Sequence, residues 1–174
     1  MPSVSFSRAK LWRRCHKAHD YRYHQRLQRK KRAVPLVRGT ILGEMLDARA
    51  LRAMNLKKRD PYNILSKYNK IYAKLFMEER EKYGDLPNDM RRLFEGYERK
   101  YANEDLKYLG VEDFVGLDLM KDIRFIGYID KRVEDAQGRH FLMDHKSHKY
   151  IPDEDQRFAD LQKTFYVWAW NEIN

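Results

Sequence analysis

Apolar residues recur at helical spacing through the first hundred residues of the chain, with polar residues between them. Four helices are predicted there: from Ser5 or Ser7 to about Gln25, from Thr40 onwards, from Asp60 to Leu75, and from Met90 to Tyr101. Each predicted start is a Ser, Thr or Asp except the last, and such side chains satisfy free amides at a helix N-terminus. Between the helices lie a basic break at 26–35 and a turn at 84–88.

The pattern changes at Gly110, where apolar and polar residues begin to alternate. Strands are predicted at 111–120, 123–133 and 141–146, with a hairpin turn at 135–138 before the last of them. Pro152 and Asp153 then open a final helix that is predicted to reach Ile173. The predicted order is therefore helices, a three-stranded meander, and a closing helix.

Length and composition favour one folded intracellular domain. The chain has 174 residues, of which 43% are hydrophobic, enough for a sizeable core. No run of about 18 apolar residues predicts a membrane span, and Met1–Lys10 lacks the apolar core of a signal peptide. One cysteine, Cys15, excludes an intramolecular disulfide, so a reducing cytoplasmic location is expected, and a phage-encoded protein acting in the host cytoplasm remains open.

The net charge of +10 is concentrated at the start of the chain. Residues 1–40 hold twelve Lys or Arg and a single acid, Asp20, whereas the remainder is close to neutral. A block of this kind attracts polyphosphates, although a solvated basic tail or an attraction to anionic membrane would give the same count. Nucleic acid is favoured because aromatic and imidazole rings are interleaved with the cations and can stack on bases. These rings are Trp12, His16, His19, Tyr21, Tyr23 and His24.

Candidate chemistry lies on the last two predicted strands. The hairpin between them brings Asp130 next to Asp144, and two neighbouring carboxylates favour a hard cation such as Mg²⁺ or Mn²⁺ between them. Asp144 and Lys146 are two residues apart, so on a strand both would point to one face. The ammonium would then orient a water or steady charge on a phosphate oxygen. A metal, a water and a cation together suit phosphodiester hydrolysis.

A less specific interpretation is that Asp130 and Lys131 are strand-edge charges and that Asp144 and Lys146 form a surface ion pair. Three features favour a site instead. Residues 141–143 are apolar, which places Asp144 at the end of a buried strand. Gly127 leaves room for a close backbone approach. Gln162 and Tyr166 follow at i, i+4 and share one face of the last helix.

These motifs, in this order, resemble the PD-(D/E)XK nucleases of the RecB/Cas4-type exonuclease group. The matching stretches are Gly127-x-Ile129-Asp130, Asp144-x-Lys146, Gln162-x-x-x-Tyr166, Arg38-Gly39-Thr40-x-x-Gly43-Glu44, and the opening helix with Trp12, Cys15 and Tyr21. The resemblance implies an α/β, restriction-endonuclease-like fold with a small mixed central sheet flanked by helices. It implies one domain over 1–174, with a basic helical part at 1–40 and a catalytic core at 108–174.

The resemblance also implies roles for individual residues. Asp130 and Asp144 would be metal ligands, Lys146 the catalytic lysine, and Gln162 and Tyr166 a pair that contacts DNA or braces the site. Further side chains are expected to contact DNA: Arg13, Arg14, Arg38 and His148.

Three departures from the family pattern bear on these expectations. The first motif usually carries histidine where this chain has Gly43, and Glu44 next to it either substitutes as a metal ligand or faces solvent. Members with an iron–sulfur cluster use four cysteines, so no such cluster is expected from this chain alone, and Cys15 is expected to be a buried structural cysteine. The family core usually continues beyond the QxxxY helix, so a fragment, a minimal version or a subunit completed by a partner are all open.

Three functions follow from these observations. The first is a divalent-metal-dependent deoxyribonuclease, an exonuclease by analogy with the family, acting in recombination, repair, phage replication or the adaptation of foreign DNA. The second is a catalytically degenerate nuclease-fold module that binds nucleic acid or a recombination or repair partner, as Gly43 and the early end suggest. The third is a basic protein-interaction domain. DNA is the expected partner, a protein partner or a second copy is possible, and no membrane is expected.

Overall fold

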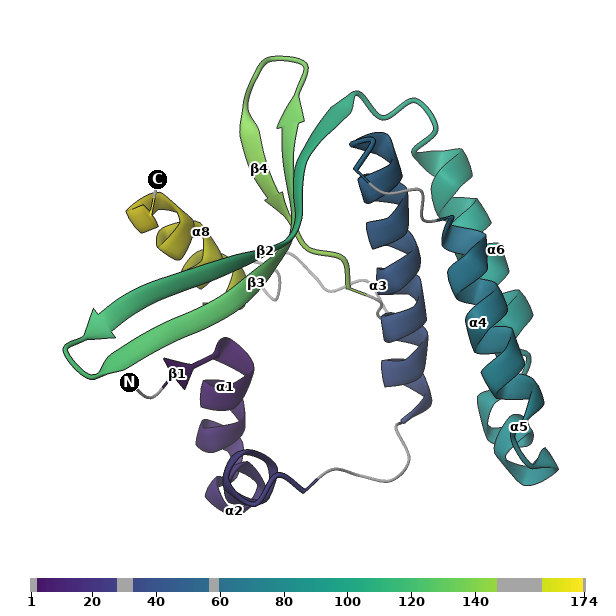
Figure 1. Cartoon of the computed structure of the whole chain (residues 1–174), viewed down its shortest axis with the longest axis horizontal. Coiled ribbons are helices and arrows are strands. Elements are labelled where there is room, and N and C mark those ends of the chain that lie inside the picture. Colours follow the sequence, from purple (N-terminus) through teal and green to yellow (C-terminus); the bar gives the residue numbers. More distant parts are fainter. Residues whose placement is uncertain (1–2, 28–32, 57–59, 147–160, 174) are drawn as a thin grey trace. The chain divides into compact units, whose positions relative to one another are not determined.

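The computed structural model describes residues 3–27, 33–56, 60–146 and 161–173. The helices are α1 (Phe6–Arg14), α2 (His16–His19), the π-helix η1 (Asp20–His24), α3 (Val34–Ala53), α4 (Pro61–Ala73), α5 (Met77–Tyr83), α6 (Leu86–Lys100) and α8 (Leu161–Ile173). The strands are β1 (Ser3–Val4), β2 (Leu106–Met120), β3 (Ile123–Asp135) and β4 (His140–Met143) (Figure 1). None of the described helices combines the length and the apolar character that crossing a bilayer requires.

A mixed sheet connects the strands in the order β1-β3-β2, with β4 also paired to β3. The two-residue strand β1 runs parallel to β3 and sets Ser3 opposite Arg124. The strand β4 runs antiparallel to β3 and sets Lys131 opposite Met143. The predicted α/β fold with a small mixed sheet and flanking helices is therefore confirmed. The strand β1 was not predicted, because two residues are too few to show alternation.

The chain forms two compact units, each assembled from segments that are distant in sequence. The terminal unit comprises residues 1–31, 112–129 and 148–174, and the helical unit comprises 32–111 and 130–147. The strands β2 and β3 contribute to both units. The single domain over 1–174 stays a prediction.

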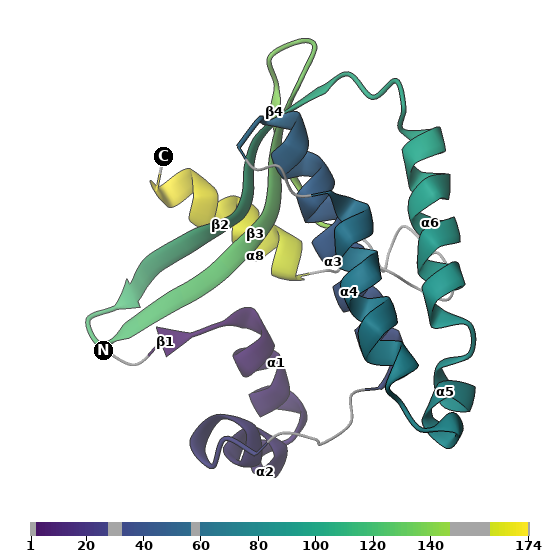
Figure 2. The ribbon, with the colours of Figure 1, turned by 45° about the vertical axis from the view of Figure 1, so that its right-hand side comes forward.

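In the helical unit, α3, α4 and α6 lie side by side (Figures 1 and 2). Their contact faces bury Ile41 and Met45 from α3, Leu65 from α4, and Met90 and Phe94 from α6. The residues from α3 recur at three- and four-residue spacing, which sets one apolar stripe against the neighbouring helices. This core holds α3 in place, and Asp47 of α3 contacts Lys131 of β3.

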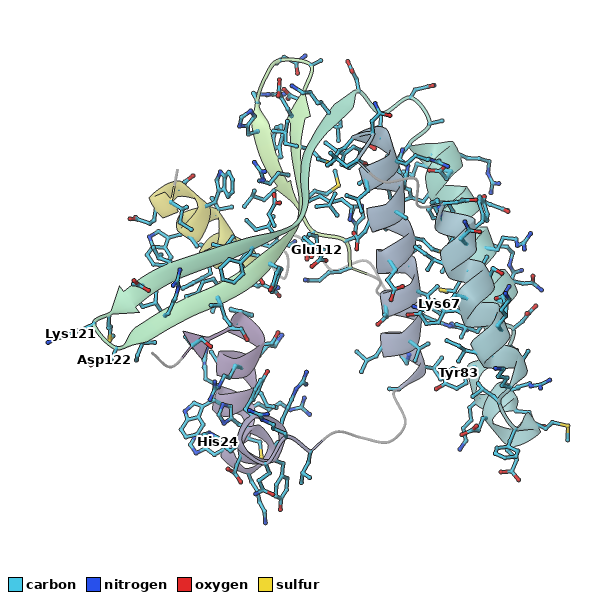
Figure 3. All side chains as sticks on the ribbon, in the orientation of Figure 1. His24, Lys67, Tyr83, Glu112, Lys121 and Asp122 are labelled. Carbon is cyan, nitrogen blue, oxygen red and sulfur yellow. The ribbon has the colours of Figure 1, made fainter. Side chains whose placement is uncertain are left out.

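The terminal unit packs α8 against β3 through aromatic rings. The Phe165 ring lies 4.4 Å from the Phe125 ring, measured between centroids, and Phe125 and Ala169 are buried. Shortly before Phe125 in the sequence, Lys121 and Asp122 form the exposed turn between β2 and β3 (Figure 3).

Several predicted helix boundaries need correction. The helix α3 begins at Val34 rather than Thr40, because Pro35 fits the first turn, where no backbone amide donor is needed. Thr40 lies inside that helix and donates its hydroxyl to the Leu36 carbonyl at 2.9 Å. The helix α4 does begin after Asp60, whose side chain accepts a hydrogen bond from the Tyr62 amide. Pro87 also fits a first turn, so α6 begins inside the predicted turn at 84–88.

The predicted first helix is divided at Cys15. Ser5 caps α1 as expected, but Cys15 takes an extended conformation, with φ −164° and ψ 108°, and its Sγ accepts a hydrogen bond from the Ala18 amide. Cys15 is exposed, so the expected burial of this cysteine is wrong. The thiol acts instead as the N-cap of α2, a role that Ser or Asp more often fills.

Two further expectations concern the end of the chain. The strand β4 ends at Met143, so Asp144–Lys146 follow the strand rather than belong to it. The argument that strand alternation aligns Asp144 with Lys146 is therefore wrong. The predicted start of the last helix at Pro152 and Asp153 lies outside the described residues, and α8 is described from Leu161.

Candidate catalytic site

Alternation along β3 decides which side chains face the core. Phe125, Gly127, Ile129 and Val133 are all buried, and Lys131 is buried with them at 2% exposure. Asp130 sits at the intervening parity, so its carboxylate leaves the opposite face of the strand. The interpretation of Lys131 as a strand-edge charge is wrong, because this lysine occupies a core position.

The pairing of β3 with β4 brings Asp130 close to Asp144. Lys131 lies opposite Met143, the last residue of β4, and Asp130 and Asp144 are the next residues along the two segments. Burial raises the pKa of Asp130, and the nearby Asp144 carboxylate raises it further, while the His145 amide and the Lys131 ammonium oppose the shift. Two carboxylates that raise one another's proton affinity in this way also attract a divalent cation.

Lys146 completes the cluster from the residues that follow β4. Its Nζ lies 2.7 Å from Asp144 Oδ2, and about a third of the lysine side chain remains exposed. This approach is an ion pair without hydrogen-bond direction, and the buried Oδ2 accepts no hydrogen bond from the described residues. Asp130, Asp144 and Lys146 are thus brought together in the helical unit, and one carboxylate oxygen keeps free acceptor capacity.

His145 lies between Asp144 and Lys146 and holds the backbone of this segment in place. Its amide donates to Asp130 Oδ2 at 3.2 Å, and its ring Nε2 lies 3.0 Å from the Tyr97 hydroxyl of α6. Burial, followed by the charges of Lys131 and Arg49, lowers the pKa of His145 to about 4. The imidazole is therefore neutral at pH 7, and its ring anchors the segment that carries Asp144 and Lys146.

Tyr97 is held in turn by Arg49 of α3. The guanidinium lies 5.3 Å from the centre of the Tyr97 ring and donates to Glu98 Oε1 and to the Tyr108 hydroxyl. Glu104 adds a second acid at 3.5 Å. Charge-assisted hydrogen bonds that satisfy most of one guanidinium make a rigid support. The site therefore rests on α3 and α6 through side chains that do not themselves carry its chemistry.

A buried ion pair lies on the other face of β3 from Asp130. Lys131 Nζ approaches Asp47 Oδ1 of α3 at 2.7 Å, with the lysine 2% exposed and the aspartate side chain 23% exposed. A buried ammonium is tolerated only beside such a partner. This pair ties α3 to β3 one residue after Asp130.

Glu44, for which a metal-ligand role and a solvent-facing position were both open, contacts side chains of α4. Its carboxylate accepts a hydrogen bond from the Tyr68 hydroxyl at 2.7 Å and lies 3.9 Å from Lys67 Nζ (Lys67 is labelled in Figure 3). Both partners belong to α4, so Glu44 joins two helices of the core. A Cβ atom at the neighbouring Gly43 would meet nothing within 4 Å, which leaves open space at the position of the family's histidine.

Gln162 and Tyr166 lie together on α8, where Gln162 Nε2 approaches the Tyr166 hydroxyl at 3.4 Å. The Tyr166 ring occupies the space beside Gly127, because a Cβ atom there would lie 2.7 Å from Tyr166 Cε1. The predicted close approach at Gly127 is thus present, and the approaching group is a side chain of the QxxxY pair. Two motifs that are about forty residues apart in sequence form one contact.

The basic side chains expected to contact DNA differ in their surroundings. Arg13 and Arg14 are exposed at the end of α1. Arg38 Nη2 instead bonds Asp89 Oδ2 at 2.7 Å and joins α3 to α6. His148 lies outside the described residues.

Sequence reasoning missed the supporting residues of the site. Lys131 carried a usable signal, since it is a charged residue at a core-facing position of an alternating strand, whereas its partner Asp47 is half-buried on α3 and carried none. Arg49, Tyr97 and His145 carried no such signal, because their contacts join α3, α6 and the end of β4. The spacing of residue types within one segment does not predict contacts between residues that are about fifty positions apart in the sequence.

The chemistry of the donors fits a hard divalent cation. Two carboxylates, one with a buried oxygen lacking a hydrogen bond, match the one or two carboxylates by which Mg²⁺ is commonly held, with water or phosphate oxygens completing the shell. No group of three or more His, Cys, Asp or Glu is gathered for metal binding within the described ranges. Asp130 and Asp144 form a pair of neighbouring carboxylates there, without a third donor of these types beside them in the described part of the chain.

Comparison with known proteins gives one finding. A sequence model described as the PD-(D/E)XK nuclease superfamily matches residues 3–174. No match was found among curated proteins.

Proposed function

The chain belongs to the PD-(D/E)XK nuclease superfamily, and we propose that it is a divalent-metal-dependent deoxyribonuclease of the RecB/Cas4-type group that digests DNA from an end. Membership of a superfamily of nucleases supports a hydrolase that acts on nucleic acid. The choice of DNA, the metal and the attack from an end are the finer parts of the proposal.

One observation carries the proposal. Asp130 lies close enough to Asp144 for that carboxylate to raise its pKa, and Asp144 in turn meets the Lys146 ammonium at 2.7 Å, at the end of one strand pair. Burial and mutual repulsion make this arrangement unfavourable for folding alone. A bound cation removes the repulsion, so the cluster is better suited to binding a metal than to stabilising the fold.

The residues would divide the work as follows. Asp130 and Asp144 would hold Mg²⁺ or Mn²⁺, which supplies an activated water and polarises a phosphate oxygen. Asp130 must be ionised to do so, although burial and Asp144 raise its pKa. Lys146, partly exposed beside Asp144, would stabilise negative charge that develops on the phosphate. The His145 amide keeps Asp130 Oδ2 oriented.

A second candidate function is favoured by the surroundings of Gly43. Glycine offers no ligand, Glu44 is engaged with Tyr68 and Lys67, and two acidic ligands remain in the described part of the chain. A site with weakened metal binding would retain the fold and its affinity for nucleic acid without cleavage. The protein would then recruit or block a recombination or repair partner.

Cleavage of end-labelled linear DNA with Mg²⁺ or Mn²⁺ tests the proposal. Asp144→Asn and Lys146→Met are expected to lower the rate by about 10²-fold or more, because each removes a group that acts at the reacting phosphate. Asp122→Asn and Lys121→Met make the same chemical changes at the exposed β2–β3 turn and should leave the rate unchanged.

The products distinguish the candidates. Release of nucleotides from linear DNA, with covalently closed circles left intact, supports attack from an end. Salt-sensitive DNA binding by the native chain without cleavage in either metal would select the second candidate. An equal loss of activity in the Asp122→Asn and Lys121→Met controls would refute the assignment of Asp144 and Lys146.

A further inference from the structure

Residues 3–27, here the N-terminal segment, form a basic surface in the terminal unit. The segment carries seven Lys or Arg and one acid, Asp20. Asp20 accepts a hydrogen bond from Gln25 at 2.6 Å. Within the described ranges, neither Asp20 nor any other acid forms an ion pair with these cations. The positive charge of the segment is therefore available to an external polyanion.

The N-terminal segment also presents a stack of rings to solvent. The Trp12 and His16 rings lie nearly parallel, with centroids 4.0 Å apart and planes at 20°, and Trp12 remains 50% exposed. The edge of this stack rests on His19, which is buried and accepts a hydrogen bond from Arg8. The stack is thus supported from within the segment, while its tryptophan keeps half of its surface in water.

Cys15 interrupts the helix between Trp12 and His16, yet the two rings keep the i, i+4 spacing of neighbouring side chains on a helix. Trp12 is near the end of α1, and His16 opens α2 after the extended residue Cys15. The segment then continues into the π-helix η1, in which Tyr23 and His24 pack against His19 (His24 is labelled in Figure 3). The π-helix is a rare geometry that appears frequently at functional sites.

Exposed cations flank the stack on its own elements. Lys10, Arg13 and Arg14 precede or follow Trp12 on α1, and Lys17 follows His16 on α2, all of them exposed. A flat ring between several cations suits a polymer that alternates planar groups with phosphates. A folded duplex hides its base faces, whereas a single strand offers them.

We propose that the Trp12–His16 stack, with Lys10, Arg13, Arg14 and Lys17 around it, is a binding surface for single-stranded DNA, on which an unpaired base stacks while the cations hold the neighbouring phosphates. The choice of DNA rests on the proposed function, since a nuclease that digests from an end needs to hold a frayed or resected strand. The proposal that a base stacks here rests on the exposed Trp12 ring and on its contacts with His16 and His19.

Binding without cleavage tests this surface. Fluorescence anisotropy of a labelled single-stranded oligonucleotide, measured in EDTA with the native chain and variants, should show affinity falling roughly 5- to 150-fold in Trp12→Ala. An oligonucleotide of the same length with abasic sites keeps the phosphates and loses the base faces. Its affinity should be nearly equal for the native chain and for Trp12→Ala.

Phe76→Ala is the matched control, because it removes another highly exposed ring at a distant position in sequence. It should bind the natural strand as the native chain does. Trp12→Leu keeps an apolar side chain against His19 but lacks a face for stacking, so it should show the same loss as Trp12→Ala even if the alanine variant is unstable. Circular dichroism checks that each variant is folded.

Two results would overturn the inference. One is an equal loss of affinity for natural and abasic strands in both Trp12 variants, which would leave charge as the sole attraction. The other is native affinity in Trp12→Leu for the natural strand. Binding is measured in EDTA, where cleavage is absent, so the two proposals fail separately. A chain that binds single strands through Trp12 but never cuts DNA refutes the proposed nuclease and leaves this surface intact. A chain that cuts DNA but binds single strands without Trp12 refutes this surface and leaves the proposed nuclease intact.

Discussion

The buried pair of Lys131 and Asp47 yields a quantitative prediction about what holds the site in place. Asp47→Ala removes the partner of an ammonium that is 2% exposed, which leaves a buried charge without compensation. Breaking a buried pair in this way costs about 3–5 kcal/mol. The lower end applies because water reaches the 23% exposed Asp47 side and would enter the space left behind. We therefore expect a loss of about 3 kcal/mol, or a fall in Tm of roughly 6–12 °C for a chain of this size.

Removal of the other partner, Lys131, is expected to lower the free energy of unfolding much less. Lys131→Met removes the buried charge itself and leaves Asp47 partly hydrated, so about 1 kcal/mol or less should be lost. The double variant Asp47→Leu/Lys131→Met replaces the pair with apolar groups and should return to within about 1 kcal/mol of the native free energy of unfolding. Asp47→Ala should cost more than Lys131→Met because the ammonium is the more deeply buried of the two charges.

Urea unfolding followed by circular dichroism measures all three variants. Glu134→Ala is the control, since it breaks an exposed pair with Lys107 at 3.2 Å that should contribute about 1 kcal/mol at most. The reasoning is refuted if Asp47→Ala costs no more than Glu134→Ala. It is also refuted if Lys131→Met costs as much as Asp47→Ala.

Two motif glycines and one aspartate give the remaining predictions. Gly43→Ala should stabilise the chain by about 0.5–1 kcal/mol, because α3 is helical there and open space receives the Cβ, whereas Gly127→Ala should cost about 1–3 kcal/mol as it meets Tyr166; urea unfolding measures both. Because the pKa of Asp130 is raised on folding, the stability of metal-free protein should fall as pH rises from about 4 through that raised pKa. Asp130→Asn should remove this dependence and be more stable than the native chain at pH 7 without metal, and a variant that keeps the native pH profile contradicts the cause.

The sequence predicted those parts of the structure that depend on local pattern. The capped start of α4 at Asp60 and the closeness of Asp130 to Asp144 after a hairpin followed from spacing alone. Alternation along β3 continues to Lys131, which is buried on the core face, but its charge led to the wrong interpretation of a strand-edge position. Local pattern is reliable here because strand parity and helix caps depend on neighbouring residues.

The remaining features depend on contacts between distant segments. Thr40 has the chemistry of an N-cap, but Pro35 extends the helix before it. Lys146 meets Asp144 in the irregular segment after β4 rather than along a strand, and the D-x-K spacing does not show where the strand ends. The contacts of Arg49, Tyr97 and His145 join three segments, and the pattern within any one segment does not predict them.

The central claim is that Asp130 and Asp144 hold one divalent cation. Isothermal titration of metal-free protein with Mn²⁺ at pH 7 measures this directly, with Asp144→Asn as the test and Asp122→Asn at the β2–β3 turn as the control. Saturable binding that disappears in Asp144→Asn and persists in Asp122→Asn is the predicted result. Unchanged Mn²⁺ affinity in Asp144→Asn would contradict the claim.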